Sequence, residues 1–94
     1  MIKYKREKMS KVEIYYRVGC DFCDRAIGLL DKKNVDYTTY DIWSDKAIFE
    51  QMLKRSNGGR TVPQVFINDQ HIGGCDDMMA LERQGKLDSL LQSD

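Results

Sequence analysis

Apolar residues recur along the chain with two different periods. Between residues 11 and 18 they fall at every second position, which predicts a β-strand. Between residues 21 and 33 they follow the 3.6-residue period of an amphipathic helix, and residues 35–42 are strand-like again. These three segments predict a βαβ unit, whose crossover is nearly always right-handed. Residues 44–56 predict a second helix, with Ser44 or Asp45 as its N-cap.

The second half of the chain predicts a β-hairpin followed by helical turns. Residues 64–68 are a short apolar strand, residues 68–70 suit a turn, and His71 starts the return strand. A third helix is expected to begin at Asp76 or Asp77 and to end at Gly85, with a last amphipathic turn after it. The predicted fold class is therefore α/β, in the order β-α-β-α-β-β-α. Its four-stranded mixed sheet joins two parallel strands to an antiparallel hairpin and is flanked by helices.

Length and charge restrict the classes of protein to which the chain can belong. Its 94 residues bound it to one domain with a modest core. The formal net charge is zero, which provides no overall field for nucleic acid or acidic membranes. A basic run within residues 1–9 is interpreted as a solvated, flexible N-terminal extension rather than a nucleic-acid arm, with the domain at 10–94. Whether translation starts at Met1 or Met9 stays open.

The cellular setting is predicted from what the sequence does and does not contain. No stretch approaches the roughly 20 apolar residues of a membrane span, and no apolar run follows the basic terminus as in a secretory signal. Three cysteines are an odd number, which argues against a secreted disulfide scaffold. We therefore expect a cytoplasmic protein, a monomer, that binds neither nucleic acid nor membrane.

Two cysteines stand where the first strand meets the first helix. Cys20 and Cys23 form a C-x-x-C motif, and this strand–helix context within a βαβ unit is typical of a redox-active thiol pair. The helix N-terminus stabilises a thiolate at Cys20, which is expected to be exposed and to attack substrate. Cys23 lies one turn later on the same side and is expected to be the resolving thiol.

A structural zinc site is an alternative use of the thiols. It would combine Cys20 and Cys23 with His71 and Cys75. The paired spacing of a typical zinc site does not recur, so no metal ligands are predicted. His71 is interpreted as a surface or hydrogen-bonded hairpin residue, and Cys75 as a small buried residue.

Two further elements carry candidate chemistry. Pro63, the only proline, follows Thr61 and Val62 and precedes a strand. A cis bond before Pro63 would expose the Val62 backbone to an extended substrate, but a trans proline that starts an edge strand fits the sequence equally well. The second element, residues 73–77, has two glycines and a helix start that offers N–H groups to a carboxylate, or simply an ordinary cap.

Together these three elements resemble the glutaredoxin family, most closely the small bacterial dithiol members. The resemblance runs from about residue 11 to 91 and rests on VEIYYRVGCDFC, RTVPQVFIND and HIGGCDDMMAL. It implies a thioredoxin-like fold and glutathione as cosubstrate. The residues implied to bind glutathione are Arg17, Phe22, Arg60, Thr61, Val62, Pro63, Gly74, Cys75 and Asp76.

The resemblance also implies which part of glutathione each of these residues contacts. Arg17 and Arg60 would hold the glycyl carboxylate, while Val62 would pair with the backbone of the cysteine, with the proline after it cis. Gly74, Cys75 and Asp76 would receive the γ-glutamyl end. Phe22 would supply an apolar wall where the family usually has tyrosine.

The implied activity is a glutathione-dependent thiol–disulfide oxidoreductase acting through Cys20 and Cys23 on protein–glutathione mixed disulfides and protein disulfides. The sequence departs from the family at Asp21, where redox-active members usually have proline. Aspartate places a negative charge beside the thiolate, which disfavours it. This departure leaves room for an alternative: a dimer that binds or transfers a [2Fe–2S] cluster through Cys20 of each chain and two glutathiones.

Overall fold

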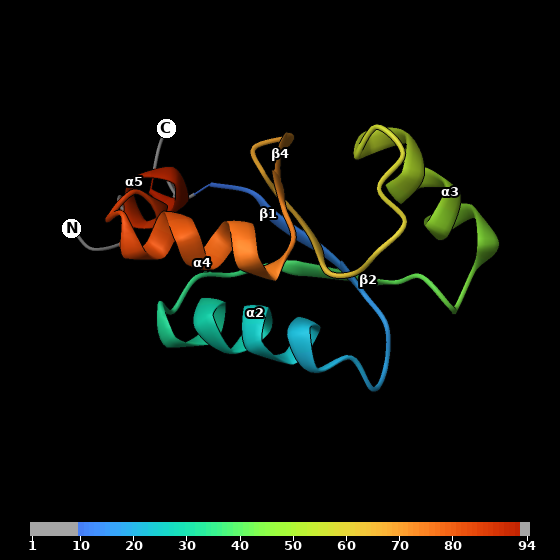
Figure 1. Ribbon diagram of the computed structural model, residues 1–94, viewed down its shortest axis with the longest axis horizontal. Helices are drawn as coiled ribbons and strands as arrows, with labels where there is room; N and C mark the ends of the chain where they lie inside the picture. The colour runs from blue at the N-terminus through green and yellow to red at the C-terminus, as the bar shows by residue number, and fades with distance from the viewer. Residues whose placement is uncertain (1–9, 93–94) are drawn as a thin grey trace.

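The computed structural model describes residues 10–92, which form helices and strands in the predicted order (Figure 1). The elements are β1 (Val12–Tyr16), α2 (Asp21–Lys32), β2 (Thr38–Asp41), α3 (Lys46–Arg55), β3 (Gln64–Ile67), β4 (Gln70–Gly73), α4 (Cys75–Arg83) and α5 (Leu87–Leu91). The predicted extension, residues 1–9, lies outside the described residues. Within 10–92, no helix is both long and apolar enough to cross a membrane.

The strands form one four-stranded mixed sheet in the order β2-β1-β3-β4. β1 runs parallel to β2, whereas β3 is antiparallel to both β1 and β4. This arrangement confirms the predicted pair of parallel strands joined to a hairpin. It makes β1 a central strand, so the loop that follows β1 leaves from the middle of the sheet.

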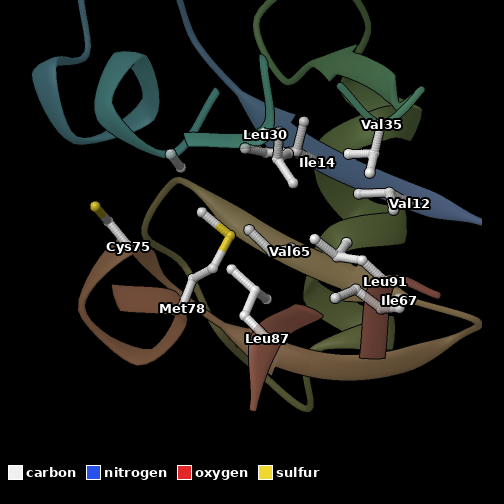
Figure 2. Close-up of a cluster of buried hydrophobic side chains, with 11 residues drawn as sticks. Val12, Ile14, Leu30, Val35, Val65, Ile67, Cys75, Met78, Leu87 and Leu91 are labelled. Carbon is white, nitrogen blue, oxygen red and sulfur yellow. The ribbon is translucent and has the colours of Figure 1, made fainter. Parts of the chain in front are cut away.

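The larger part of the core lies between the sheet and helices α2 and α4. Ile14 and Val65 on the sheet face Leu30 of α2 and Met78 of α4 across this layer (Figure 2). The side chains of α2 and α4 thereby bury one face of the sheet, and the two helices contact each other. Their N-termini carry Cys20 and Gly74 as N-caps.

Two predicted strands are longer than the observed ones by more than one residue. β1 ends at Tyr16, and Val18 is 68% exposed instead of continuing the buried face. β2 is an edge strand that pairs only with the four residues from Glu13 to Tyr16 of β1. Residues before Thr38 therefore have no strand partner, and Val35 packs into the core instead.

Helix α3 covers the opposite face of the sheet and is tied to it by a polar network. Arg55 donates hydrogen bonds to Glu13 Oε1 and to the Tyr15 hydroxyl, both at 2.9 Å, and Tyr40 donates to Glu13 Oε2 at 2.8 Å. Burial alone would raise the pKa of Glu13, but the hydrogen bonds from Arg55 and Tyr40 hold that pKa below its ordinary value of 4.5. The network fixes the C-terminal end of α3, where the loop to β3 begins.

Candidate active site

Cys20 occupies the N-cap of α2. The backbone N–H of Cys23 donates to Cys20 Sγ at 3.1 Å, and this sulfur lies 3.8 Å from the carbonyl oxygen of Val62. The expectation that Cys20 is exposed was wrong: only 4% of the residue is accessible. The reason is that its side chain turns inward to cap the helix and to meet the loop before β3.

The second thiol of the motif has a different environment. Cys23 is fully buried, and burial, followed by its interaction with the Cys20 sulfur, raises the pKa of Cys23 to about 12. The thiol of Cys23 is therefore protonated at neutral pH. Of the two sulfurs, Cys20 is the one at the positive end of a helix, where a thiolate is stabilised. The geometry therefore favours Cys20 as the nucleophile, the role expected from the sequence, and this role stays a prediction.

A groove with a cavity volume of about 450 Å³ opens beside the Val62 carbonyl. The Val62–Pro63 peptide bond is cis, which decides between the two isomers left open by the sequence. The groove is lined by Phe22, Thr61, Val62, Pro63, Gln64, His71, Gly73, Gly74, Cys75, Asp76 and Asp77. Seven of the nine residues predicted to bind glutathione are thereby brought together from three separate segments of the chain.

One wall of the groove is the N-terminus of α4, which differs in detail from the prediction. The helix begins at Cys75, one residue earlier than expected, with Gly74 as N-cap. Asp77 is not a starting residue: its Oδ2 reaches back and accepts the Gly74 N–H at 3.0 Å. The Gly74 amide is therefore occupied, and the amides of Cys75 and Asp76, in the first turn, have no acceptor within the helix.

Cys75 is buried at the groove, as predicted. Burial, and then the negative charge of Asp76, raise the pKa of the Cys75 thiol. The thiol is thereby kept protonated and poorly nucleophilic.

The two predicted arginines lie outside the lining of the groove. The guanidinium of Arg17 stacks on Trp43 at 5.3 Å from the ring centroid and donates to the Val18 carbonyl at 3.3 Å. Arg60 stacks over Phe49 at 5.9 Å. Their predicted contact with a carboxylate stays a prediction.

The four residues of the zinc alternative do not form a cluster. Across residues 10–92, no three His, Cys, Asp or Glu side chains are grouped so that they could hold a metal ion. His71 instead shares a hydrogen bond of 2.6 Å with Gln64 and stacks on Phe66, which confirms its interpretation as a hydrogen-bonded hairpin residue.

Comparison with known proteins identifies the relatives of this chain. The glutaredoxin family model matches residues 12–72. A probable glutaredoxin of Synechocystis sp. is 52% identical over 84 residues, covering 89% of this chain and 96% of that protein. Glutaredoxin 3 of Escherichia coli is 50% identical over 84 residues, covering 89% of this chain and all of that protein.

The chain belongs to the glutaredoxin family.

Glutaredoxins are thiol–disulfide oxidoreductases, and solved glutaredoxin structures share the fold described above. The crystal structure of a buckwheat glutaredoxin–glutathione complex superposes with a TM-score of 0.79 at 32% identity, covering 96% of this chain and 86% of that one. The thioredoxin-like fold implied by the resemblance is thus confirmed.

Four residues that line the groove were not among the predicted binding residues. Gly73 and Asp77 belong to the candidate element 73–77, whereas Gln64 and His71 lie outside every element predicted to bind glutathione. Gln64 carried a usable signal, because a glutamine that opens an otherwise apolar, buried strand needs internal hydrogen-bond partners. His71 carried none, since its partner is seven residues away on another strand.

Proposed function

We propose that this glutaredoxin reduces protein–glutathione mixed disulfides and protein disulfides at the expense of glutathione. The observation that supports this most strongly is the position of Cys20. Its sulfur sits at a helix N-terminus, 3.8 Å from the backbone carbonyl that borders the groove, with a buried and protonated thiol one turn away. A groove of about 450 Å³ lies in the size range of small-molecule sites.

In the first step, the Cys20 thiolate attacks the glutathione sulfur of a protein–glutathione mixed disulfide. A Cys20–glutathione disulfide forms, the bond between the glutathione and protein sulfurs breaks, and the protein leaves as a thiolate that takes a proton from water. The thiolate of a second glutathione then attacks the glutathione sulfur on Cys20. Glutathione disulfide leaves, and Cys20 returns as a thiolate.

Protein disulfides follow a route that uses both cysteines. Cys20 attacks one sulfur of the protein disulfide and becomes covalently linked to it, while the other sulfur leaves as a thiolate. This thiolate takes the proton of Cys23, which then attacks the Cys20 sulfur. A Cys20–Cys23 disulfide forms, and the linked protein sulfur leaves as a thiolate that takes a proton from water. Two glutathiones reduce this disulfide and are oxidised to glutathione disulfide. The high pKa of Cys23 makes this second route the slower one at neutral pH.

The binding of glutathione is assigned to the residues around the groove. The amides of Cys75 and Asp76 suit the α-carboxylate of the γ-glutamyl residue, because the N-terminus of α4 attracts an anion. The Asp76 carboxylate suits the ammonium beside it. The Val62 backbone suits an extended peptide, while Arg17 and Arg60 are assigned to the glycyl carboxylate.

The test is turnover of a glutathionylated peptide, followed by consumption of glutathione, for wild type and two serine variants. We expect wild type to be active, Cys20→Ser to be inactive and Cys23→Ser to retain activity, because the monothiol route needs only Cys20. An inactive wild type, or an active Cys20→Ser, would contradict the proposal.

The cluster-binding alternative is favoured by one observation, the aspartate at position 21 in place of the usual proline. Anaerobic purification separates the two functions. A brown dimer that contains iron and sulfide would support cluster binding, whereas a colourless monomer that reduces the peptide supports the oxidoreductase alone.

A further inference from the structure

The loop that carries the groove residues Thr61–Pro63 is bordered by two buried polar side chains. Ser56 ends α3 and is 7% exposed, and Gln64 begins β3 and is 6% exposed. Within residues 10–92, the only buried polar or charged residues are these two and Glu13. Because buried polar groups are costly unless hydrogen-bonded, their partners indicate what they hold in place.

Gln64 uses both ends of its side-chain amide. Its Nε2 donates to the carbonyl oxygen of Thr61 at 3.0 Å, and its Oε1 lies 2.6 Å from Nε2 of His71. The imidazole must donate in this pair, because the amide oxygen is only an acceptor. The ring of His71 is held in turn by stacking on Phe66, with centroids 4.9 Å apart. The carbonyl next to Val62 is thereby connected to strand β4.

Ser56 holds the other end of the same loop. Its hydroxyl oxygen accepts the Gly59 N–H at 2.9 Å and lies 2.7 Å from the Met52 carbonyl, to which it donates. The two polar side chains meet at Gly59. A Cβ on that residue would lie 2.7 Å from Ser56 Oγ and 2.9 Å from Gln64 Nε2, so only glycine fits between them.

We propose that Gln64 is a positioning residue that sets the Thr61–Val62 backbone against Cys20 to receive the glutathione backbone. This inference rests on the proposed function. Gln64 lines the groove, yet it is only 6% exposed and both ends of its amide already have protein partners, so its contribution runs through the loop rather than through a ligand contact. His71 supports the orientation of the amide. We call Ser56, Gly59, Gln64 and His71 the loop clamp.

The first test replaces Gln64 with methionine, which keeps the length of the side chain and removes both hydrogen bonds. We expect KM for a glutathionylated peptide to rise about tenfold, as for loss of one or two buried hydrogen bonds. Alkylation of Cys20 by iodoacetamide should not become slower, because the loop covers the Cys20 sulfur and its release leaves that sulfur at least as accessible. Gln84→Met, the same substitution at an exposed position after α4, is the matched control and should leave both quantities unchanged.

A second pair of variants tests the same clamp without removing a polar group. Gly59→Ala inserts a Cβ between the two polar side chains, and we expect it to raise KM as Gln64→Met does. Gly28→Ala is its control, because a Cβ there meets no atom within 4 Å.

A third variant tests the support that His71 gives to the amide. His71→Phe keeps the stacking on Phe66 but loses the hydrogen-bond donor. When His71→Phe is combined with Gln64→Met, KM should rise little further, because both substitutions act through the same amide.

The outcomes separate the inference from the function on which it rests. An unchanged KM in Gln64→Met, or an equal loss of Cys20 alkylation, would overturn the positioning role. An inactive wild type overturns the proposed function, and amide hydrogen exchange then decides the clamp alone. Faster exchange of residues 57–63 in Gln64→Met, with α2 unaffected, supports the clamp, whereas identical exchange overturns it.

Discussion

Gly73 is the position at which a single methyl group should do most damage to the wall of the groove. Its φ of +119° lies in a region that residues with a side chain rarely adopt. A Cβ there would also lie 2.2 Å from Oδ2 of Asp77, the atom that accepts the Gly74 N–H at the start of α4. Alanine at position 73 therefore strains the backbone and pushes the capping carboxylate away.

The two costs can be estimated separately. Holding a non-glycine residue in such a conformation costs about 1–3 kcal/mol, and loss of a helix N-cap costs about 0.5–2 kcal/mol. We expect Gly73→Ala to lower the free energy of unfolding by about 2–4 kcal/mol, a large share of the roughly 5–14 kcal/mol typical of a domain of this size. Urea unfolding followed by circular dichroism measures this change. Asp77→Ala removes the capping carboxylate without straining residue 73, so it should lower the free energy of unfolding by the capping cost alone.

Gly28→Ala is the matched substitution in open space. Gly28 is exposed inside α2, with helical φ, and its new Cβ would touch nothing. We expect a gain of about 0.5–1 kcal/mol from helix propensity. The reasoning would be refuted if Gly73→Ala were as stable as wild type, or if both alanines changed stability in the same direction.

Three further predictions concern the thiols and the polar network. Because burial raises the pKa of Cys23 to about 12 and also raises that of Cys75, iodoacetamide at pH 8 should label only Cys20 in the folded protein; rapid labelling of either other thiol, seen by peptide mass spectrometry, would contradict this. Asp21→Pro removes a negative charge beside the nucleophile, so alkylation at pH 6 should be faster than in wild type, and an equal or slower rate would count against that electrostatic effect. The folded-state pKa of Glu13 is lowered, so its contribution to stability is present above about pH 4.5 and is lost as pH falls through the folded value. The free energy of unfolding of Glu13→Gln should therefore depend less on pH below 4.5, and equal slopes in urea titrations would argue against it.

Local sequence patterns predicted the elements well because those patterns act over a few residues. Asp45 was one of two predicted caps of α3, and its side chain accepts the Ala47 N–H at 2.9 Å. Helix α2 was predicted to within one residue of its observed end. β2 was predicted too long, because the length of an edge strand depends on how many residues its neighbour offers for pairing, which the strand's own sequence does not contain.

The candidate site shows the same division. By itself, the sequence determined which residue types were available: a thiol pair at a helix start, a lone proline before a strand, and a glycine pair before another helix. Spacing predicted that Cys20 and Cys23 would share one face of α2, because one turn separates them. Only the tertiary structure decided that Cys20 is nearly buried, that Asp77 occupies the Gly74 amide, and that Gln64 bridges Thr61 to His71. Burial and hydrogen-bond partners arise where segments distant in the chain pack together, and that packing is set by the whole fold and by no single stretch of sequence.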